Sequence, residues 1–338
     1  MVGASGAAVA RININGSLDT TFYTSGSRVS NFGGQAYQLA LTSDGKVYQI
    51  AEAALVIRYH TDGAYDTAFN TSGSKDYDLG ADGHADGGYA ILIQTDGLLV
   101  IGGNTDDGAD EDRFSVSRFL TDGTLDTAFS TNGTDWQDVV SGCDTGLALA
   151  LQSDGLIVQS GYGGFGGLTD AIVVARYQTN GVLDPAFDGD GKKTWSPFAT
   201  TESIGMLIAT DGDLVFAGSD DTLKNAAVIR LMSNGAIETS FATGGFASLD
   251  WSGQEGDYFR GVALDSDGSV VLAGTAAQTT THFDFGIARY LPSGALDTAF
   301  STDGKATTTA NKGSSGEIRA ILGLPNGQIL GVGSIAVH

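Results

Sequence analysis

The stretch Ala288-Arg289-Tyr290-Leu291-Pro292-Ser293-Gly294-Ala295-Leu296-Asp297-Thr298-Ala299-Phe300 decides the fold, because its pattern returns six times along the chain. In each copy, which we call the frame, an arginine is followed by a carboxylate after eight residues and by phenylalanine after eleven. Glycine follows the arginine after five and fifteen residues. Copies spaced by roughly 50–60 residues indicate a repeat architecture. The frame residues are Arg11, Arg58, Arg118, Arg176, Arg230 and Arg289; Asp19, Asp66, Asp126, Asp184, Glu238 and Asp297; and Phe22, Phe69, Phe129, Phe187, Phe241 and Phe300.

The apolar runs and turns within each repeat predict four short strands. In the unit that begins at Ala36, the apolar runs 37–41, 46–50 and 55–59 read as strands, and 75–78 reads as a weaker fourth strand. An Asp-Gly turn between apolar runs is a strong hairpin signal, because glycine accepts a positive φ. Four antiparallel strands in each of many repeats are typical of a β-propeller with one sheet per blade. A β-solenoid is the main competing architecture.

The six frames predict an all-β, six-bladed β-propeller that spans residues 1–338 as one domain. The chain opens on an expected third strand at 8–12 and closes on an expected second strand at 328–332, so we expect both termini to share the last blade. Such closure would remove exposed edge strands. The expected units are 36–85, 86–143, 144–200, 201–255, 256–315, and 316–338 together with 1–33.

Composition excludes several classes of partner. The net charge of −23 argues against nucleic acid, which is bound through clustered lysine and arginine. It equally disfavours an anionic membrane surface, and no apolar run is long enough to span a bilayer. Cys143 is the only cysteine, so no disulfide forms within the chain. The first residues lack the features of a signal peptide, so an exported protein would have lost its signal or would be part of a longer chain.

The frame resembles the bacterial delta-60 repeat family, whose units read Ala-Arg-Tyr-x-x-x-Gly-x-Leu-Asp-x-x-Phe followed by an Asp-Gly hairpin. Residues 288–300 carry this resemblance, which extends over essentially the whole chain. It implies a propeller-like domain in large secreted or surface proteins of bacteria, and it implies no chemistry. The fifth copy departs from the pattern with Ile237-Glu238, which keeps the carboxylate.

We expect the repeated arginine and carboxylate to be a structural staple, because six identical copies argue against an active pair. Function is therefore sought where the copies differ, and binding residues commonly lie on variable loops held by a rigid scaffold. The second-to-third and fourth-to-first connections vary strongly, and they share one face of a propeller. Aromatic candidates for sugar binding near this face are Tyr162, Phe165, Trp195, Trp251, Tyr258 and His282. Burial between blades is the alternative fate of such side chains.

Two acidic groups are candidate calcium sites, because calcium takes six to eight oxygen ligands. The first is the loop 104–112, with Asp106, Asp110 and Asp112, for which a solvated acidic loop is the alternative. The second is a set of carboxylates placed nine or ten residues before the first hairpin turn of five units, where they would ring one mouth of a central channel. Arg260 and Arg319 offer neutralisation without metal. This set is Asp86, Asp144, Glu202, Asp257 and Glu317.

These observations favour a non-enzymatic extracellular or bacterial cell-surface module that recognises a glycan or a surface protein through its variable face. No catalytic residue is assigned, since the four histidines fall in different units without a metal-ligand or Ser/His/Asp arrangement. Two alternatives stay open. One is a calcium-dependent propeller hydrolase or lactonase with its site at the acidic channel mouth. The other is a structural subunit of a surface fibre, whose partners would be further copies of the protein or other domains of a larger chain.

Overall fold

The structure is a computed structural model that contains two compact units. One unit comprises Met1–Gln159 with Tyr177–Val182, and the other comprises Ser160–Arg176 with Leu183–His338. The residues that the structure describes are 6–13, 15, 17–32, 34–79, 86–106, 112–164, 171–197, 201–220, 224–251, 253, 256–265, 267–279, 282–309, 314–323 and 328–337.

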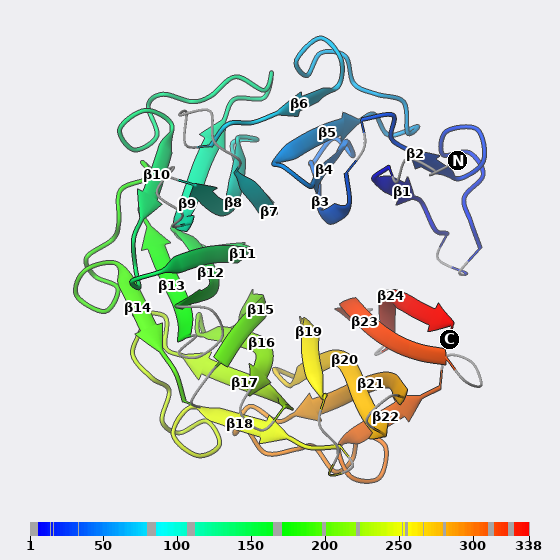
Figure 1. Ribbon diagram of the computed structural model, residues 1–338, viewed down its shortest axis with the longest axis vertical. Coiled ribbons are helices and arrows are strands. Elements are labelled where there is room, and N and C mark those ends of the chain that lie inside the picture. Colours follow the sequence, from blue (N-terminus) through cyan, green and yellow to red (C-terminus); the bar gives the residue numbers. More distant parts are fainter. Residues whose placement is uncertain are drawn as a thin grey trace. The chain divides into compact units, whose positions relative to one another are not determined.

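All regular structure in the described residues is β-strand, and five antiparallel sheets contain four strands each (Figure 1). Each of these blades follows chain order, so that every strand pairs with its neighbours in sequence. The first blade consists of β3(Ala36–Leu41), β4(Val47–Ala51), β5(Leu55–Tyr59) and β6(Ser74–Asp76), and the second of β7(Gly87–Ile93), β8(Leu99–Asp106), β9(Asp112–Phe119) and β10(Thr134–Gln137). The third consists of β11(Cys143–Leu151), β12(Ile157–Gly164), β13(Ala171–Tyr177) and β14(Lys192–Trp195), and the fourth of β15(Thr201–Ile208), β16(Leu214–Asp220), β17(Asn225–Leu231) and β18(Phe246–Leu249). The fifth consists of β19(Tyr258–Leu264), β20(Val270–Thr279), β21(His282–Tyr290) and β22(Lys305–Thr308).

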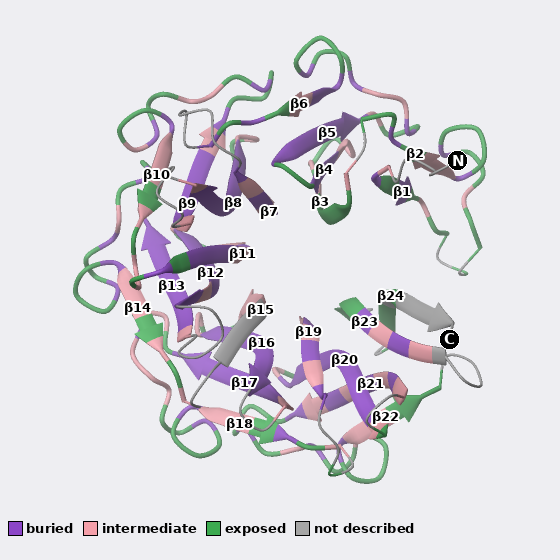
Figure 2. Cartoon of the chain, viewed as in Figure 1, coloured by how far each residue is buried: buried purple, intermediate pink, exposed green. Residues whose placement is uncertain are grey.

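The second and third strands of each blade form the core. Every residue of β5 and β16 is buried, and β8, β13 and β17 are buried over almost their whole length (Figure 2). Strands that are covered on both faces read as continuous apolar runs rather than as alternating ones, which is the pattern of Leu214-Val215-Phe216-Ala217 in β16. The fourth strands are short and partly exposed, as expected for the outer edge of a blade.

Connection lengths separate the two ends of every blade. The first-to-second connection has five residues in each blade (42–46, 94–98, 152–156, 209–213 and 265–269), and the third-to-fourth connection has fourteen (60–73, 120–133, 178–191, 232–245 and 291–304). At the other end, the second-to-third connection varies from two to six residues (52–54, 107–111, 165–170, 221–224 and 280–281). The fourth-to-first connection varies from five to ten (77–86, 138–142, 196–200, 250–257 and 309–313). Each blade therefore has one constant end and one variable end.

The all-β class and the four-stranded antiparallel blades are as predicted, but the prediction of six blades is wrong. The described residues form five, and the strands expected to share a sixth blade form two separate two-stranded sheets. These are β1(Ala8–Ala10) with β2(Ser27–Val29), and β23(Ser314–Gly323) with β24(Ile329–Val337). The frame at Arg11 has strands of only three residues, which offer few ladder hydrogen bonds against the entropy of ordering a chain end. Six frames thus do not make six blades.

The N-terminal strand pair nevertheless packs on the first blade. Ala7, Val9 and Phe22 share a buried cluster with Ala51, Leu55, Ile57 and Tyr59 of that blade.

Among the described residues, no helix has the length and apolar character needed to cross a membrane.

Candidate functional site

The frame arginines connect neighbouring elements of the repeat. Arg118 donates from Nε to Asp126 Oδ2 at 2.8 Å and from Nη1 to the carbonyl oxygen of Thr179, in the next constant turn, at 2.6 Å. Its guanidinium also lies 4.6 Å from the centre of the Phe129 ring. One planar side chain therefore holds its own turn and the next one, which the fork geometry of arginine permits. Arg11 and Arg176 make the same three contacts, and Arg289 donates from Nε to Asp297 in the same way. Arg58 makes an ion pair with Asp66 and keeps the other two contacts.

The frame phenylalanine and the residue after it make a second connection to the same turn. The buried Phe129 ring contacts Gly181, where an added Cβ would lie 2.7 Å from the ring. Ser130, with a left-handed φ of 48°, donates its N–H to the carbonyl oxygen of Asn180 at 2.6 Å. Equivalent contacts join Phe69 to Gly123, Asn70 to Asp122, Phe187 to Gly235 and Asp188 to Asn234. The repeated residues thus hold the constant ends of neighbouring blades together.

The fifth frame is arranged differently. Arg230 makes ion pairs with Asp211 and Asp213 of the first hairpin turn, the latter at 3.0 Å from Nε to Oδ2, whereas Glu238 accepts hydrogen bonds from Ser240. Glutamate is one methylene longer than aspartate, and the Glu238 side chain bends back to its own turn. At the position after the Asp-Gly of the first hairpin turn, Asp213 replaces the Lys, Leu or Ser of the other blades. Burial and the nearby Asp211 raise the pKa of Asp213, although the Arg230 hydrogen bond opposes this shift. The expected Arg230–Glu238 staple is therefore replaced by a pairing within the hairpin.

In the first blade a lysine reinforces the staple. Asp66 is 1% exposed and lies 2.8 Å from Arg58 Nε and 3.0 Å from Lys46 Nζ. Burial raises the pKa of Asp66. Hydrogen bonds from Lys46 and the Ala68 N–H, together with the Arg58 charge, lower the pKa by more than burial raises it, so the pKa lies below its ordinary value. A lowered folded pKa adds stability above the unfolded pKa of about 4, and this stability is lost as the pH falls below it.

We expect Lys46→Met to lower the free energy of unfolding at pH 7 by about 1 kcal/mol, because one charge-assisted hydrogen bond to a buried carboxylate is lost. The pH midpoint of acid unfolding should rise, since the Asp66 pKa returns towards its ordinary value. Urea unfolding at pH 7 and an acid titration followed by circular dichroism measure both effects. Lys193→Met, which removes a surface pair with Asp188, is the control and should change little. An unchanged acid midpoint in Lys46→Met would contradict the assignment.

The carboxylates expected at a channel mouth accept backbone hydrogen bonds at the variable ends of the blades. Asp257 accepts from the Trp251 N–H at 2.9 Å and the Ala277 N–H at 2.7 Å, and burial raises its pKa. Asp144 accepts from the N–H groups of Val139 and Val140 at 2.7 and 3.1 Å, and Asp86 accepts from the Leu79 N–H. Each of these carboxylates therefore ties down the connection that enters its blade.

The remaining acidic candidates are placed as follows. Glu317 pairs with Arg260 and, at 3.1 Å, with Arg319, while the Glu202 side chain lies outside the described residues. Asp106 and Asp112 are opposite each other in the β8–β9 register, and Asp110 lies outside the described residues. Within the described part of the chain, no group of three or more His, Cys, Asp or Glu side chains is placed to hold a metal ion. Calcium at either acidic group stays a prediction.

The two tryptophans chosen from the sequence pack against neighbouring strands. Trp251 lies 5.5 Å from the Phe259 ring and contacts Gly286, and Trp195 lies 6.1 Å from the Phe246 ring and contacts Gly245. Tyr258 and His282 are partly exposed at the start of β19 and β21, at the variable end of the fifth blade. His282 Nε2 is 3.2 Å from Asp284 Oδ1, and Asp284 Oδ2 accepts from Thr309 Oγ1 at 3.3 Å. Tyr162 is partly exposed in β12, and Phe165 lies outside the described residues.

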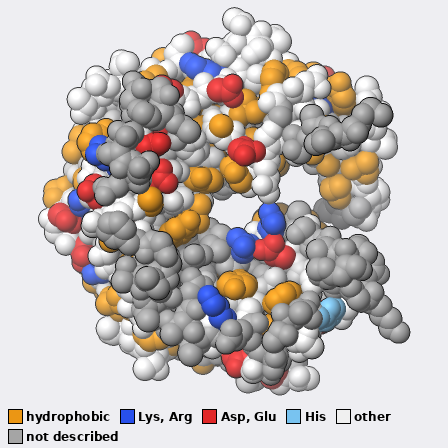
Figure 3. Space-filling model, in the orientation of Figure 1, with side chains coloured by type: hydrophobic (Ala, Val, Ile, Leu, Met, Phe, Trp, Pro, Cys, Tyr) orange, Lys and Arg blue, Asp and Glu red, His pale blue; other side chains and the backbone are white. Residues whose placement is uncertain are grey.

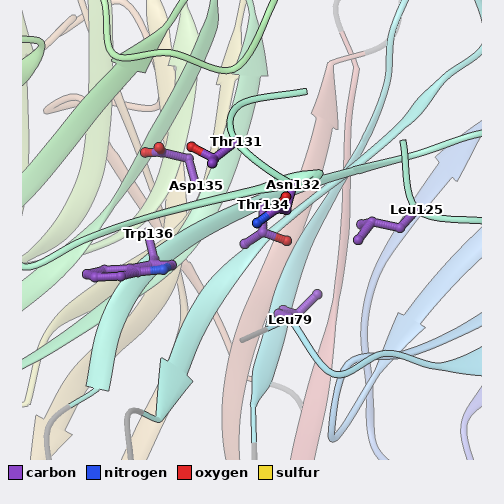
Figure 4. Close-up of a pocket in the computed structure, with 7 residues that line it drawn as sticks. All are labelled: Leu79, Leu125, Thr131, Asn132, Thr134, Asp135 and Trp136. Carbon is purple, nitrogen blue, oxygen red and sulfur yellow. The ribbon is translucent and has the colours of Figure 1, made fainter. Parts of the chain in front are cut away.

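Sequence inspection missed Trp136, the tryptophan that the structure leaves 49% exposed. It lies on β10 beside a pocket of about 370 Å³ lined by Leu79, Leu125, Thr131, Asn132, Thr134, Asp135 and Trp136 (Figure 4). The signal was its place in the frame, eighteen residues after Arg118. The other five copies have Val29, Asp76, Thr194, Ser248 and Thr307 at this position. Trp195 stands one residue later in its copy and so points to the opposite face of its strand.

Comparison with known proteins supports the architecture. Residues 2–22, 94–129, 152–187 and 266–300 match a family described as "Domain of unknown function (DUF5122) beta-propeller". These segments end at Phe22, Phe129, Phe187 and Phe300, so each closes on the frame phenylalanine. The match supports a propeller repeat family. A search of the curated proteins finds no match.

Solved structures give the same fold. The chain is similar to a putative oxidoreductase (glucose dehydrogenase) from Thermus thermophilus, with a TM-score of 0.55 and 13% identity over 87% of this chain and 89% of that one. It is also similar to streptogramin B lyase, with a TM-score of 0.54 and 12% identity over 99% and 88%. A protein of unknown function from Bacteroides caccae has a TM-score of 0.50 and 12% identity over 90% and 95%. At these identities the likeness shows the fold alone.

Proposed function

We propose that this protein is a non-enzymatic recognition or adhesion module that binds a glycan or a surface protein through the variable ends of its blades. One observation carries the proposal: connections at one end of each blade keep a fixed length, whereas those at the other end differ from blade to blade. A rigid scaffold with variable loops is the usual arrangement for a binding surface. Extracellular or bacterial cell-surface placement, as in delta-60 repeat proteins, is part of the proposal.

The chemistry of the described side chains agrees with binding rather than turnover. Five of the six repeated arginines pair with the carboxylate of their own frame, Arg230 pairs with Asp211 and Asp213, and Asp86, Asp144 and Asp257 accept hydrogen bonds from backbone N–H groups. At the variable end of the fifth blade, Tyr258 at the start of β19 offers an aromatic ring, and the His282–Asp284 pair at the start of β21 offers polar groups. Such a combination binds hydroxyl-rich or peptide surfaces. On the face in Figure 3, acidic, basic and hydrophobic side chains lie in small interspersed groups.

We expect the double variant Tyr258→Ala with His282→Ala to lose binding on a glycan array or on a panel of extracellular proteins, with its melting temperature nearly unchanged. Both side chains are partly exposed, so their truncation removes contacts without opening a core cavity. The matched control is Thr302→Ala on the constant end of the same blade, which should bind as the parent protein does. Binding by the parent that survives the double variant would exclude this end of the fifth blade, and the absence of any array signal would contradict the recognition proposal.

A further inference from the structure

Two residues of the second blade depart from the frame and lie together. Trp136 of β10 is the only aromatic residue at its position among the six copies, and Arg113 of β9 is the only arginine at its own. The Arg113 guanidinium lies 4.4 Å from the centre of the Trp136 ring. The pair is therefore particular to this blade and is not part of the repeated frame.

The pair presents an ordered aromatic surface to solvent. Trp136 remains 49% exposed although arginine lies against its ring, and the cation–π contact restricts the orientation of the side chain. An exposed tryptophan leaves a large apolar surface in water, which favours a ligand that covers it. A ring that is already held in place loses less conformational freedom when a ligand binds.

The rest of the pocket combines an apolar wall with hydrogen-bonding groups. Leu79 and Leu125 supply the apolar part, and the exposed Thr131 and Asn132 supply a hydroxyl and an amide (Figure 4). The Asp135 carboxylate is fixed by hydrogen bonds from Ser130 Oγ at 2.9 Å and Gln137 Nε2 at 2.8 Å. Asp135 directly precedes Trp136 on β10, so the two side chains leave the strand on opposite faces (Figure 4).

We propose that this pocket is a subsite for a neutral oligosaccharide, whose C–H face covers the Trp136 ring while its hydroxyls bond Asn132 and Thr131. A sugar ring has an apolar face and a polar rim, which the lining matches, and the volume of about 370 Å³ falls within the range of small-molecule sites. Asp135 and the net charge of −23 disfavour acidic sugars. A concave site with a polar lining favours a saccharide over a flat protein surface. Apart from Leu79, which lies in the connection 77–86, the lining belongs to β10 and to the constant connection 120–133, and the proposal does not depend on the function proposed above.

The test uses the full chain and four neutral probes: cellotetraose, maltotetraose, mannotetraose and chitotetraose. Calorimetric titration and intrinsic tryptophan fluorescence should detect at least one probe with a Kd of about 1 mM or tighter. Trp136→Ala should weaken that binding by about tenfold or more, and Asn132→Ala by severalfold with the ring retained. Tyr23→Ala is the matched control, because Tyr23 is also an exposed aromatic with an arginine, Arg28, 4.3 Å from its ring, and it lies outside the pocket. It should bind like the parent protein.

The outcomes separate the two proposals. Weaker saccharide binding in Trp136→Ala and Asn132→Ala, with normal saccharide binding by Tyr258→Ala/His282→Ala, supports the pocket whatever the variable ends bind. No binding of any probe at about 10 mM overturns the proposal, as does equal binding by parent and Trp136→Ala. Capture of a protein through Trp136 with no saccharide bound overturns it as well.

Discussion

We expect Arg176→Ala to lower the free energy of unfolding by about 3 to 5 kcal/mol, because it leaves a buried carboxylate without its partner. The Arg176 and Asp184 side chains are 8% and 10% exposed, and Nε and Oδ2 are 2.8 Å apart. The same substitution removes the hydrogen bond to the carbonyl oxygen of Ser233 and the contact with the Phe187 ring. Urea unfolding measures the loss as a lowered midpoint with an unchanged slope.

Arg11→Ala is the matched control for burial. Arg11 makes the same contacts, with Asp19 at 2.7 Å and the Phe22 ring at 5.1 Å, but its side chain is 41% exposed. An exposed pair is screened by water and contributes little, so the loss should be far smaller than for Arg176→Ala. Arg176→Lys keeps the charge but not the planar fork, and an intermediate stability is expected. Equal losses of unfolding free energy at both positions would show that burial does not determine the strength of the staple. An unfolding free energy that is unchanged in Arg176→Ala would contradict the structural role of Arg176.

Local pattern predicted most of each blade. The Asp-Gly turns located the hairpins, and the frame placed an arginine opposite an aspartate across one turn. Closure could not be predicted in this way, because it depends on pairing between residues at opposite ends of the chain and on strand lengths that the frame does not specify. The three-residue strands β1 and β2 illustrate this limit.

The candidate site was less predictable because it depends on which face of a strand a side chain occupies. Trp195 and Trp136 stand one residue apart in their frames, and this difference puts the first against Phe246 and the second into solvent. Arg230 has a different partner where two positions depart from the pattern, Asp213 in its hairpin and Glu238 in its frame. Both outcomes follow from neighbours distant in sequence, which composition and spacing leave unspecified.

The second large effect is expected at Gly294, where the backbones of two neighbouring blades approach closely. Ala242 donates its N–H to the carbonyl oxygen of Ser293 at 2.7 Å, and a Cβ added at Gly294 would lie 2.4 Å from the Ala242 nitrogen. Backbone atoms on both sides prevent relief by side-chain rotation, and the φ of +83° is itself unfavourable for alanine. Overpacking and the left-handed conformation together should cost about 3 kcal/mol or more in Gly294→Ala.

Gly244→Ala separates the two contributions. Gly244 has a φ of +76° and no atom within 4 Å of an added Cβ, so it reports the conformational cost without the clash. Its loss should be about 1 to 2 kcal/mol. Hydrogen exchange of the Ala242 amide should increase in Gly294→Ala and not in Gly244→Ala, because only the first substitution forces the turn of one blade away from the next. If the two variants lose equal stability, the close approach of Ser293 and Ala242 does not hold these blades together.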